Sequence, residues 1–197
     1  NFKFCWKGKL RKFVLKIIVN KIGIRKKILD IRKRIDEKNL QINFKDIFRI
    51  IKKSKAAGKI VGGYYPYNHE VDTTKILKEF EKKRYRISLP KIKKNFRMDF
   101  FKWSSKEPLS INKYGIPEPV SDKVVYPDIL LVPIVAFDKN FNRIGYGGGF
   151  YDRYIKKIKK NKNILTIGLA YSFQKVKKIQ TNNNDMKLNF IITNKKD

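Results

Sequence analysis

The chain has 197 residues, of which 42% are hydrophobic and 13% aromatic, a composition typical of a globular domain. It contains 48 lysines and arginines but only 17 acidic residues, so the formal net charge is +31. Such a charge attracts nucleic acid, anionic lipid and phosphorylated small molecules, although a surface of solvated lysines in a Lys-, Asn- and Ile-rich sequence is the plainer explanation.

Counts of single residue types exclude several classes of site. Cys5 is the only cysteine, so the chain forms no internal disulfide, which suits a reducing compartment and predicts a cytoplasmic protein. His69 is the only histidine, which argues against histidine-based triads and zinc sites. No run approaches the roughly 18 apolar residues of a membrane span, so we expect none.

The first half of the chain predicts helices separated by short strands. Residues 1–20 are basic and aromatic, and we interpret them as an N-terminal extension of doubtful role before a single domain at 21–197. Isoleucines at helical spacing, amphipathic patterns and β-branched runs mark the elements that follow. They predict helices at 24–35, 44–57 and 71–84, and strands at 60–61, 85–90 and 97–103.

The second half of the chain contains wholly apolar runs. "DILLVPIVAF" (128–137) is a continuous one, which predicts a strand buried on both faces and ending at a glycine-rich loop. A helix at 150–160 and strands at 164–171 and 188–193 follow. Strands that alternate with helices predict an α/β fold: a single three-layer, Rossmann-like domain whose mostly parallel central sheet is flanked by helices.

The loop "RIGYGGGFYDRY" (143–154) holds four glycines in five positions. It precedes a predicted helix at the sheet edge where open α/β folds bind ligands, and its backbone N–H groups can surround an anion. It lacks the Lys-Ser/Thr ending of a Walker A motif and does not match GxGxxG. The loop therefore predicts phosphate binding, with a purely structural strand–helix turn as the alternative.

The segment "PDILLVPIVAFDKNFNRIGYGGGFYDRY" closely resembles the signature of 5-formyltetrahydrofolate cyclo-ligases, also called methenyltetrahydrofolate synthetases. From about Lys21 onward, "KIGIRKKILDIRKR", "YYPYNHEVDT", "GIPEP" and "NNDMKLNFIIT" resemble further family motifs in the family's order. The resemblance implies an enzyme that uses ATP and Mg²⁺ to close 5-formyltetrahydrofolate into 5,10-methenyltetrahydrofolate, with release of ADP and phosphate. ATP would phosphorylate the formyl oxygen, and ring closure would then expel phosphate.

The resemblance also implies an ATP site. Lys21 and Arg25, four residues apart on one helix face, would contact the phosphates. Arg143 would be a bidentate phosphate donor, and together with Tyr151 it would act at the catalytic centre. The residues of the nucleotide loop would be Arg143, Ile144, Gly145, Tyr146, Gly147, Gly148, Gly149, Phe150 and Tyr151.

For the metal, the resemblance implies Asp152 and Asp185 as the carboxylates that hold Mg²⁺ beside the phosphates. Taken alone, Asp152 also fits the first turn of a helix, and Asp185 fits a turn in "NNND". Asn189 and Asn194 stand where many family members carry acidic residues. We therefore expect these two positions to reduce the negative charge near the metal.

For folate, the resemblance implies Tyr65 and Glu70, because a carboxylate accepts hydrogen bonds from the donor-rich edge of a pterin. Tyr151 and Trp103 are candidate stacking surfaces, although Trp103 also suits a core position. The full set of residues expected at the folate substrate is Tyr65, Glu70, Trp103, Tyr146, Gly147, Gly148, Gly149 and Phe150.

Two other functions stay open at the level of sequence. The net charge and aromatic-basic stretches such as "NFRMDFFKW" also suit a nucleic-acid-binding protein. A different ATP-dependent kinase or ligase could use the same fold. The glycine loop favours a small-molecule site, so we expect a monomeric folate enzyme with no specific nucleic-acid partner.

Overall fold

The computed structural model describes residues 20–35, 40–54 and 58–194. Its centre is a seven-stranded sheet in the order β11-β10-β7-β1-β2-β3-β6. Neighbours from β11 to β2 run parallel, whereas β3 and β6 are antiparallel, which confirms a mostly parallel sheet. The strands are β1 (Ile60–Gly62), β2 (Arg86–Lys93), β3 (Arg97–Trp103), β6 (Val124–Val125), β7 (Ile129–Pro133), β10 (Leu165–Ala170) and β11 (Phe190–Thr193).

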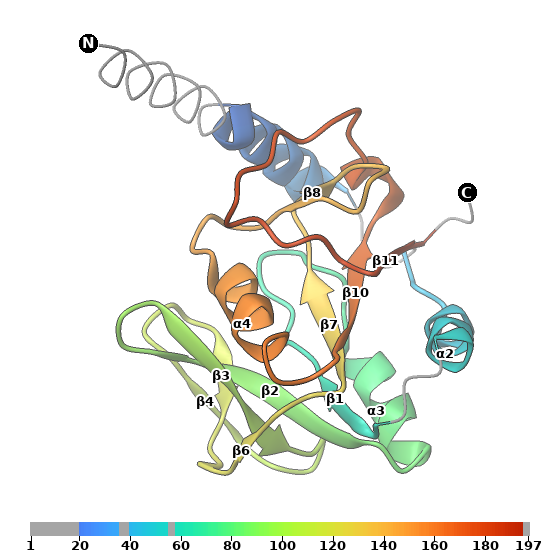
Figure 1. Cartoon of the computed structure of the whole chain (residues 1–197), viewed down its shortest axis with the longest axis vertical. Coiled ribbons are helices and arrows are strands. Elements are labelled where there is room, and N and C mark those ends of the chain that lie inside the picture. Colours follow the sequence, from blue (N-terminus) through green and yellow to red (C-terminus); the bar gives the residue numbers. More distant parts are fainter. Residues whose placement is uncertain (1–19, 36–39, 55–57, 195–197) are drawn as a thin grey trace.

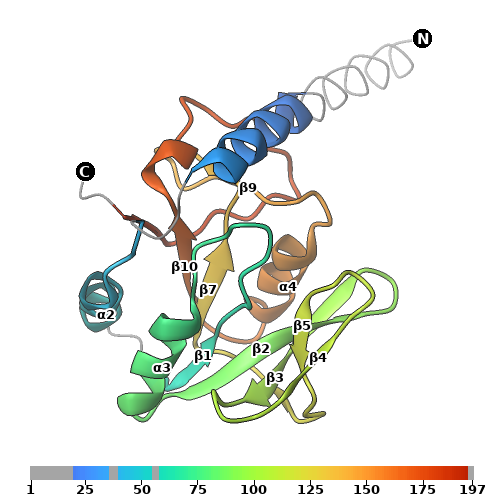
Figure 2. The same ribbon diagram turned by 180° about the vertical axis from the view of Figure 1, so that it is seen from behind.

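Helices cover both faces of this sheet, as predicted (Figures 1 and 2). In β7, Leu130 and Val132 pack in one core cluster with α4 (Phe150–Ile158). Ile129 and Leu131 point to the other face, into a cluster with α2 (Phe44–Lys53) and α3 (Thr74–Lys82). This alternation explains the continuous apolar run, because a strand with helices on both sides has no solvent face.

Residues 20–34 are helical and form the N-terminal helix of the described chain. Ile28 packs there with Val135, Ala136 and Ile144, outside the main sheet. The predicted helix at 44–57 is α2, which begins after Asn43, whose side chain accepts a hydrogen bond from the Lys45 N–H. It ends at Lys53, and residues 55–57 lie outside the described ranges, as do residues 1–19 of the expected extension.

The predicted single strand at 128–137 is wrong in its second half. β7 ends at Pro133, and the chain then forms β8 (Ala136–Phe137), which pairs with β9 (Arg143–Ile144) in a separate ribbon. Pro133 has no N–H to extend a ladder, and side chains take the next two backbone carbonyls, those of residues 134 and 135. The glycine loop therefore follows this ribbon and not the buried strand itself.

Several short elements were not predicted. A hairpin of β4 (Leu109–Ile111) and β5 (Pro117–Pro119) includes the "GIPEP" segment, and the 3₁₀ helix η2 (Ser172–Gln174) follows β10. Elements of two or three residues carry too little periodicity to be predicted.

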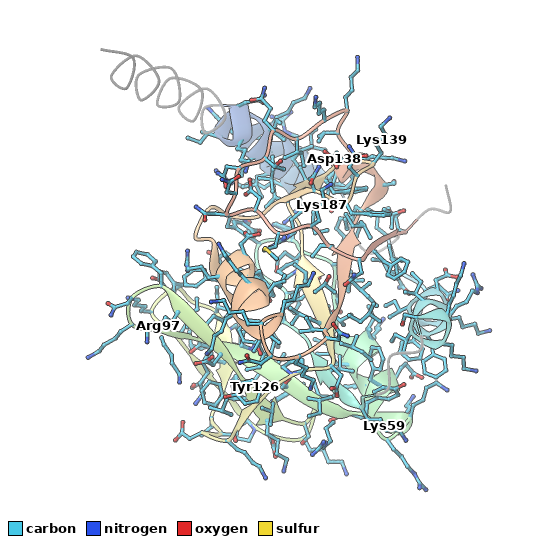
Figure 3. All side chains as sticks on the ribbon, in the orientation of Figure 1. Lys59, Arg97, Tyr126, Asp138, Lys139 and Lys187 are labelled. Atoms are coloured by element: carbon cyan, nitrogen blue, oxygen red, sulfur yellow. The ribbon has the colours of Figure 1, made fainter. Side chains whose placement is uncertain are left out.

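The positive charge is spread over the whole molecule. Figure 3 shows basic side chains pointing outward at distant ends, for example Lys59 and Lys139. Within the described ranges, no helix is long and apolar enough to cross a membrane.

Candidate active site

The glycine loop, residues 145–149, is held by the N-terminal helix. The Nε of Arg25 donates a hydrogen bond of 2.8 Å to the Gly145 carbonyl. A Cβ built on Gly147 would lie 3.4 Å from the Arg25 Nη2. Burial lowers the pKa of the Arg25 guanidinium. Arg25 thus lies against the expected nucleotide loop, and its contact with ATP phosphates stays a prediction.

The protein itself explains the glycines at three of the four positions in this loop. Gly147 and Gly149 have φ values of +105° and +65°, in the region that favours glycine. A Cβ on Gly148 would lie 2.5 Å from the Phe150 ring. Gly145 differs, because its φ is ordinary and a Cβ there would meet nothing within 4 Å. Within the described structure, neither packing nor backbone conformation requires a glycine at this fourth position.

Arg143 points inward and joins three segments of the chain. Its side chain is only 4% exposed and forms an ion pair of 3.0 Å with Asp152 Oδ1. Its Nη1 donates to the Met186 carbonyl at 2.6 Å, and the Met186 N–H donates to the same Asp152 oxygen at 2.9 Å. The Arg143 guanidinium therefore binds groups of the protein itself. We had expected it to be free as a bidentate phosphate donor.

Asp152 and Asp185 line one pocket of about 280 Å³ with polar and basic neighbours. Lys21 Nζ forms an ion pair of 2.5 Å with Asp185 Oδ2, which also accepts from the Asn182 N–H at 2.7 Å. Among the described residues, these bonds use one oxygen of each carboxylate. The other oxygens fit a hard cation that shares its remaining ligands with phosphates. The pocket is lined by Gly149, Asp152, Arg153, Lys156, Asn182, Asn184 and Asp185.

Glu70 lies on the segment 63–73, which follows β1 at the carboxyl edge of the sheet. It is 6% exposed, and its Oε2 accepts a hydrogen bond of 3.1 Å from the Tyr67 N–H. Burial raises the pKa of Glu70 to about 7, while the Tyr67 N–H and the charge of Arg32 act in the opposite direction. Tyr65, on the same segment, is half-buried.

The glycine loop and the segment 63–73 meet through aromatic side chains. The rings of Tyr67 and Tyr146 pack edge to face with centroids 6.0 Å apart, and the Tyr146 hydroxyl donates to the Tyr67 carbonyl at 3.4 Å. Burial raises the pKa of Tyr146 to about 12 and raises that of Tyr151 further, in both cases with help from the charge of Glu70. The structure thus places the expected nucleotide residues next to the expected folate residues.

Three residues singled out from the sequence do not join this group. Trp103 is buried in the core, where its indole N–H donates to the Glu107 carbonyl at 3.1 Å. The Asn189 side chain accepts from the backbone and hydroxyl of Thr166, and Asn194 accepts from the Ser172 N–H. No hydrogen bond of the described residues joins either asparagine to Asp152 or Asp185, and each instead holds a segment that lies 23 or 22 residues earlier in the chain.

Arg32 is a residue of this region that sequence reasoning missed. Its Nη1 donates to the Tyr146 hydroxyl at 3.0 Å and its Nη2 to the Ile134 carbonyl at 2.6 Å. A signal was present, since Arg32 follows Arg25 by seven residues and so lies on the same helix face. Among so many basic residues, that spacing did not single it out.

A more open hollow of about 390 Å³ lies elsewhere on the surface. It lies at the amino-terminal ends of β1 and β2, whereas the glycine loop lies at the opposite edge of the sheet. The described lining of this hollow contains no residue expected at the site and no carboxylate, so we centre the candidate site on the glycine loop. Its lining is Phe48, Lys59, Lys82, Lys83, Arg84 and Tyr85.

Comparison with known sequences finds one family. A profile of the 5-formyltetrahydrofolate cyclo-ligase family matches residues 17–194. The 5-formyltetrahydrofolate cyclo-ligase of Haemophilus influenzae is 33% identical over 138 residues, which cover 66% of this chain and 73% of that protein. The corresponding protein of Escherichia coli K12 is 29% identical over 140 residues, covering 68% of this chain and 76% of that protein.

Solved structures give a matching result. The 5,10-methenyltetrahydrofolate synthetase of Aquifex aeolicus aligns with a TM-score of 0.71 and 30% identity, covering 89% of this chain and 90% of that chain. The synthetase of Mycoplasma pneumoniae aligns with a TM-score of 0.70 over 89% of this chain and 99% of that chain. At 24% identity, the second match is a likeness of fold.

Proposed function

This chain belongs to the 5-formyltetrahydrofolate cyclo-ligase family, and on that premise we propose that it closes 5-formyltetrahydrofolate into 5,10-methenyltetrahydrofolate, using ATP and Mg²⁺. The observation that carries the proposal is the meeting of the glycine loop with the Glu70 segment, beside a pocket lined by two carboxylates. A reaction between a nucleotide and a folate needs both subsites next to each other.

At the nucleotide subsite, bound MgATP would supply the phosphoryl group that turns the formyl oxygen into a leaving group. The chain's own contribution is position and charge. Backbone N–H groups of the glycine loop would hold phosphate oxygens, with the Lys21 and Arg25 cations beside them. Asp152 and Asp185 would hold Mg²⁺, and Arg143 would fix Asp152 through their ion pair.

At the folate subsite, Glu70 would accept hydrogen bonds from the donor edge of the pterin, most strongly in its ionised form, in which both oxygens are acceptors. Tyr65 and the aromatic rings of Tyr146 and Tyr151 would line the flat parts of the substrate. Trp103 has no part in this proposal, because its indole belongs to the core.

The direct experiment is to incubate the purified protein with 5-formyltetrahydrofolate and MgATP and to record methenyl absorbance. Product should form only when both ATP and Mg²⁺ are present. Folded protein that forms no methenyl product at any pH tested would overturn the proposal. Product without ATP would overturn the assigned co-substrate alone. The cytoplasmic location, the monomeric state and the domain boundary at residue 21 stay predictions.

A further inference from the structure

Arg32 is a charged side chain in a fully buried position. It is 1% exposed, and its guanidinium donates to two neutral oxygens, the Tyr146 hydroxyl and the Ile134 carbonyl. Its Nε is buried and has no hydrogen-bond partner among the described residues. A buried cation with an unsatisfied N–H destabilises a fold relative to a well-packed apolar residue. Its presence in this position therefore points to a role beyond stability.

The contacts of Arg32 lead to the folate subsite. The Tyr146 hydroxyl, which accepts from Arg32, donates in turn to the Tyr67 carbonyl at 3.4 Å. The Tyr67 N–H donates to Glu70 Oε2 at 3.1 Å. A chain of hydrogen bonds thus joins the N-terminal helix, the glycine loop and the segment 63–73. Of the two loops that Arg32 joins, the glycine loop is expected to contact both ATP and folate, and the segment 63–73 to contact folate.

The charge of Arg32 also acts on Glu70, since it lowers the pKa that burial raises to about 7. Among the described residues, four tyrosines lie near Glu70, one on its own segment and three on other parts of the fold. Burial raises the pKa of three of them, so they are neutral near pH 7. These neighbours are Tyr64 after β1, Tyr146 in the glycine loop, Tyr151 in α4 and Tyr171 after β10, whose hydroxyl donates to the Glu70 carbonyl.

We propose that Arg32 is a positioning residue of the folate subsite. It keeps the Tyr146 hydroxyl and the Glu70 carboxylate in the relative positions that folate binding needs. The inference rests on the proposed function, because it assumes that Glu70 receives the folate. Arg32 itself contacts the protein and not the substrate. It acts through geometry on Tyr146 and through charge on Glu70.

The test measures the dissociation constant of 5-formyltetrahydrofolate against pH, and that of ATP in parallel, for the parent and three variants. In the parent, folate affinity should fall as the pH drops through about 7, because Glu70 becomes protonated. Arg32→Met removes a positive charge, so the pKa of Glu70 should rise. The pH midpoint of the decrease in folate affinity should then increase by roughly one unit. At pH 7 the variant should then bind folate roughly fivefold more weakly, because about a tenth of Glu70 is ionised instead of about half, with a much smaller change for ATP.

Arg32→Lys keeps the charge but cannot donate in two fixed directions. It should restore the parent's pH midpoint without restoring the full affinity. Arg32→Gln is the second neutral variant and should shift the midpoint like Arg32→Met, so the test does not depend on one variant folding. In a Glu70→Gln background, neither neutral substitution should change the pH profile of folate binding.

A purely structural role predicts a different pattern. Arg32→Met and Arg32→Gln would then lower the melting temperature and weaken folate and ATP binding by the same factor, with the midpoint unmoved. That result overturns the inference. If the parent protein itself binds no folate, the proposed function fails instead, so the two failures are distinguishable.

Discussion

At the scale of single residues, Glu70 shows a conflict between folding and binding. The folded protein keeps this carboxyl buried, with a pKa of about 7 instead of its ordinary value of 4.5. Between these two pH values the folded state binds more protons than the unfolded state, so the free energy of unfolding decreases as pH rises. Burial of this acid therefore destabilises the protein at neutral and alkaline pH.

We accordingly expect Glu70→Gln to stabilise the fold at pH 8, by up to about 3 kcal/mol, since the neutral amide avoids burying a charge. The gain should shrink as the pH falls from about 7 to 4.5 and vanish below that range, where the parent carboxyl is protonated in both states. The same variant should weaken folate binding and leave ATP binding nearly unchanged. Thermal melts across pH, with titrations of each ligand, test both expectations. A variant that is less stable than the parent at pH 8 would contradict the first.

Replacing Asp152 should reduce the stability of the protein more than replacing Asp185, although both should affect Mg²⁺ binding. Asp152→Asn and Asp185→Asn should each raise the Mg²⁺ concentration needed for half-maximal turnover, because an amide oxygen carries less charge. Asp152→Asn should also destabilise the protein by roughly 1–3 kcal/mol, since it leaves the buried Arg143 without its counterion. Asp185→Asn should destabilise the protein less, because the ion pair that it breaks, with Lys21, is more exposed.

Asp122→Asn is the control for these variants. Asp122 pairs with Lys91 and its side chain is 96% exposed, away from the pocket. It should change neither the Mg²⁺ requirement nor the melting temperature appreciably. An unchanged Mg²⁺ requirement in both pocket variants would place the metal elsewhere.

At the scale of elements, the glycine loop allows phosphate binding and loop structure to be tested separately. A Cβ at Gly145 meets nothing within 4 Å and requires no unusual φ. Gly145→Ala should therefore leave the melting temperature unchanged within about 1 °C, since neither packing nor backbone is strained. If phosphate lies against this backbone, the added methyl group should weaken ATP binding by about tenfold.

Gly23→Ala is the matched control, because a Cβ there also meets nothing within 4 Å. It lies in the N-terminal helix, where alanine should stabilise by about 0.5–1 kcal/mol. ATP binding should be unaffected. Gly148→Val is less informative, since its side chain would collide with the Phe150 ring and disturb the loop in any case. Parent-like ATP affinity in Gly145→Ala would show that phosphate does not contact that residue.

At the scale of the whole molecule, the net charge of +31 has consequences of its own. Basic side chains project from opposite ends of the fold (Figure 3), so their mutual repulsion opposes compaction. They also surround a site expected to bind two anionic substrates. Salt should therefore act on stability and on substrate affinity in opposite directions.

We expect the melting temperature to rise when NaCl increases from about 20 mM to about 500 mM, because salt screens the repulsion. Over the same range the KM for ATP should increase, since attraction of the anionic substrate is screened as well. Scanning calorimetry and steady-state kinetics measure the two effects. A melting temperature that falls steadily with salt would show that specific ion pairs outweigh net repulsion.

The elements with long, uniform patterns were determined by the sequence alone. The apolar runs that became β7 and β10 and the helical spacing of residues 24–35 each indicate which faces are buried, because the pattern itself is formed by residues only a few positions apart. The "RMDFFKW" segment became β3 with the predicted ends. Lys21 and Arg25 share a helix face for the same local reason, and the order of motifs indicated the family.

Only the tertiary structure decided which partner each polar side chain has. Arg143 bonds to a carbonyl 43 residues away, Arg32 reaches Tyr146 across 114 residues, and Trp103 joins the core. The division of 128–137 at Pro133 likewise depends on donors from distant segments, among them Arg32 and Gln174. Periodicity predicts that a face is buried, but it does not say what covers it. The role of a buried charged side chain depends on the segments that pack over it, because the groups that replace water set its pKa and its hydrogen bonds.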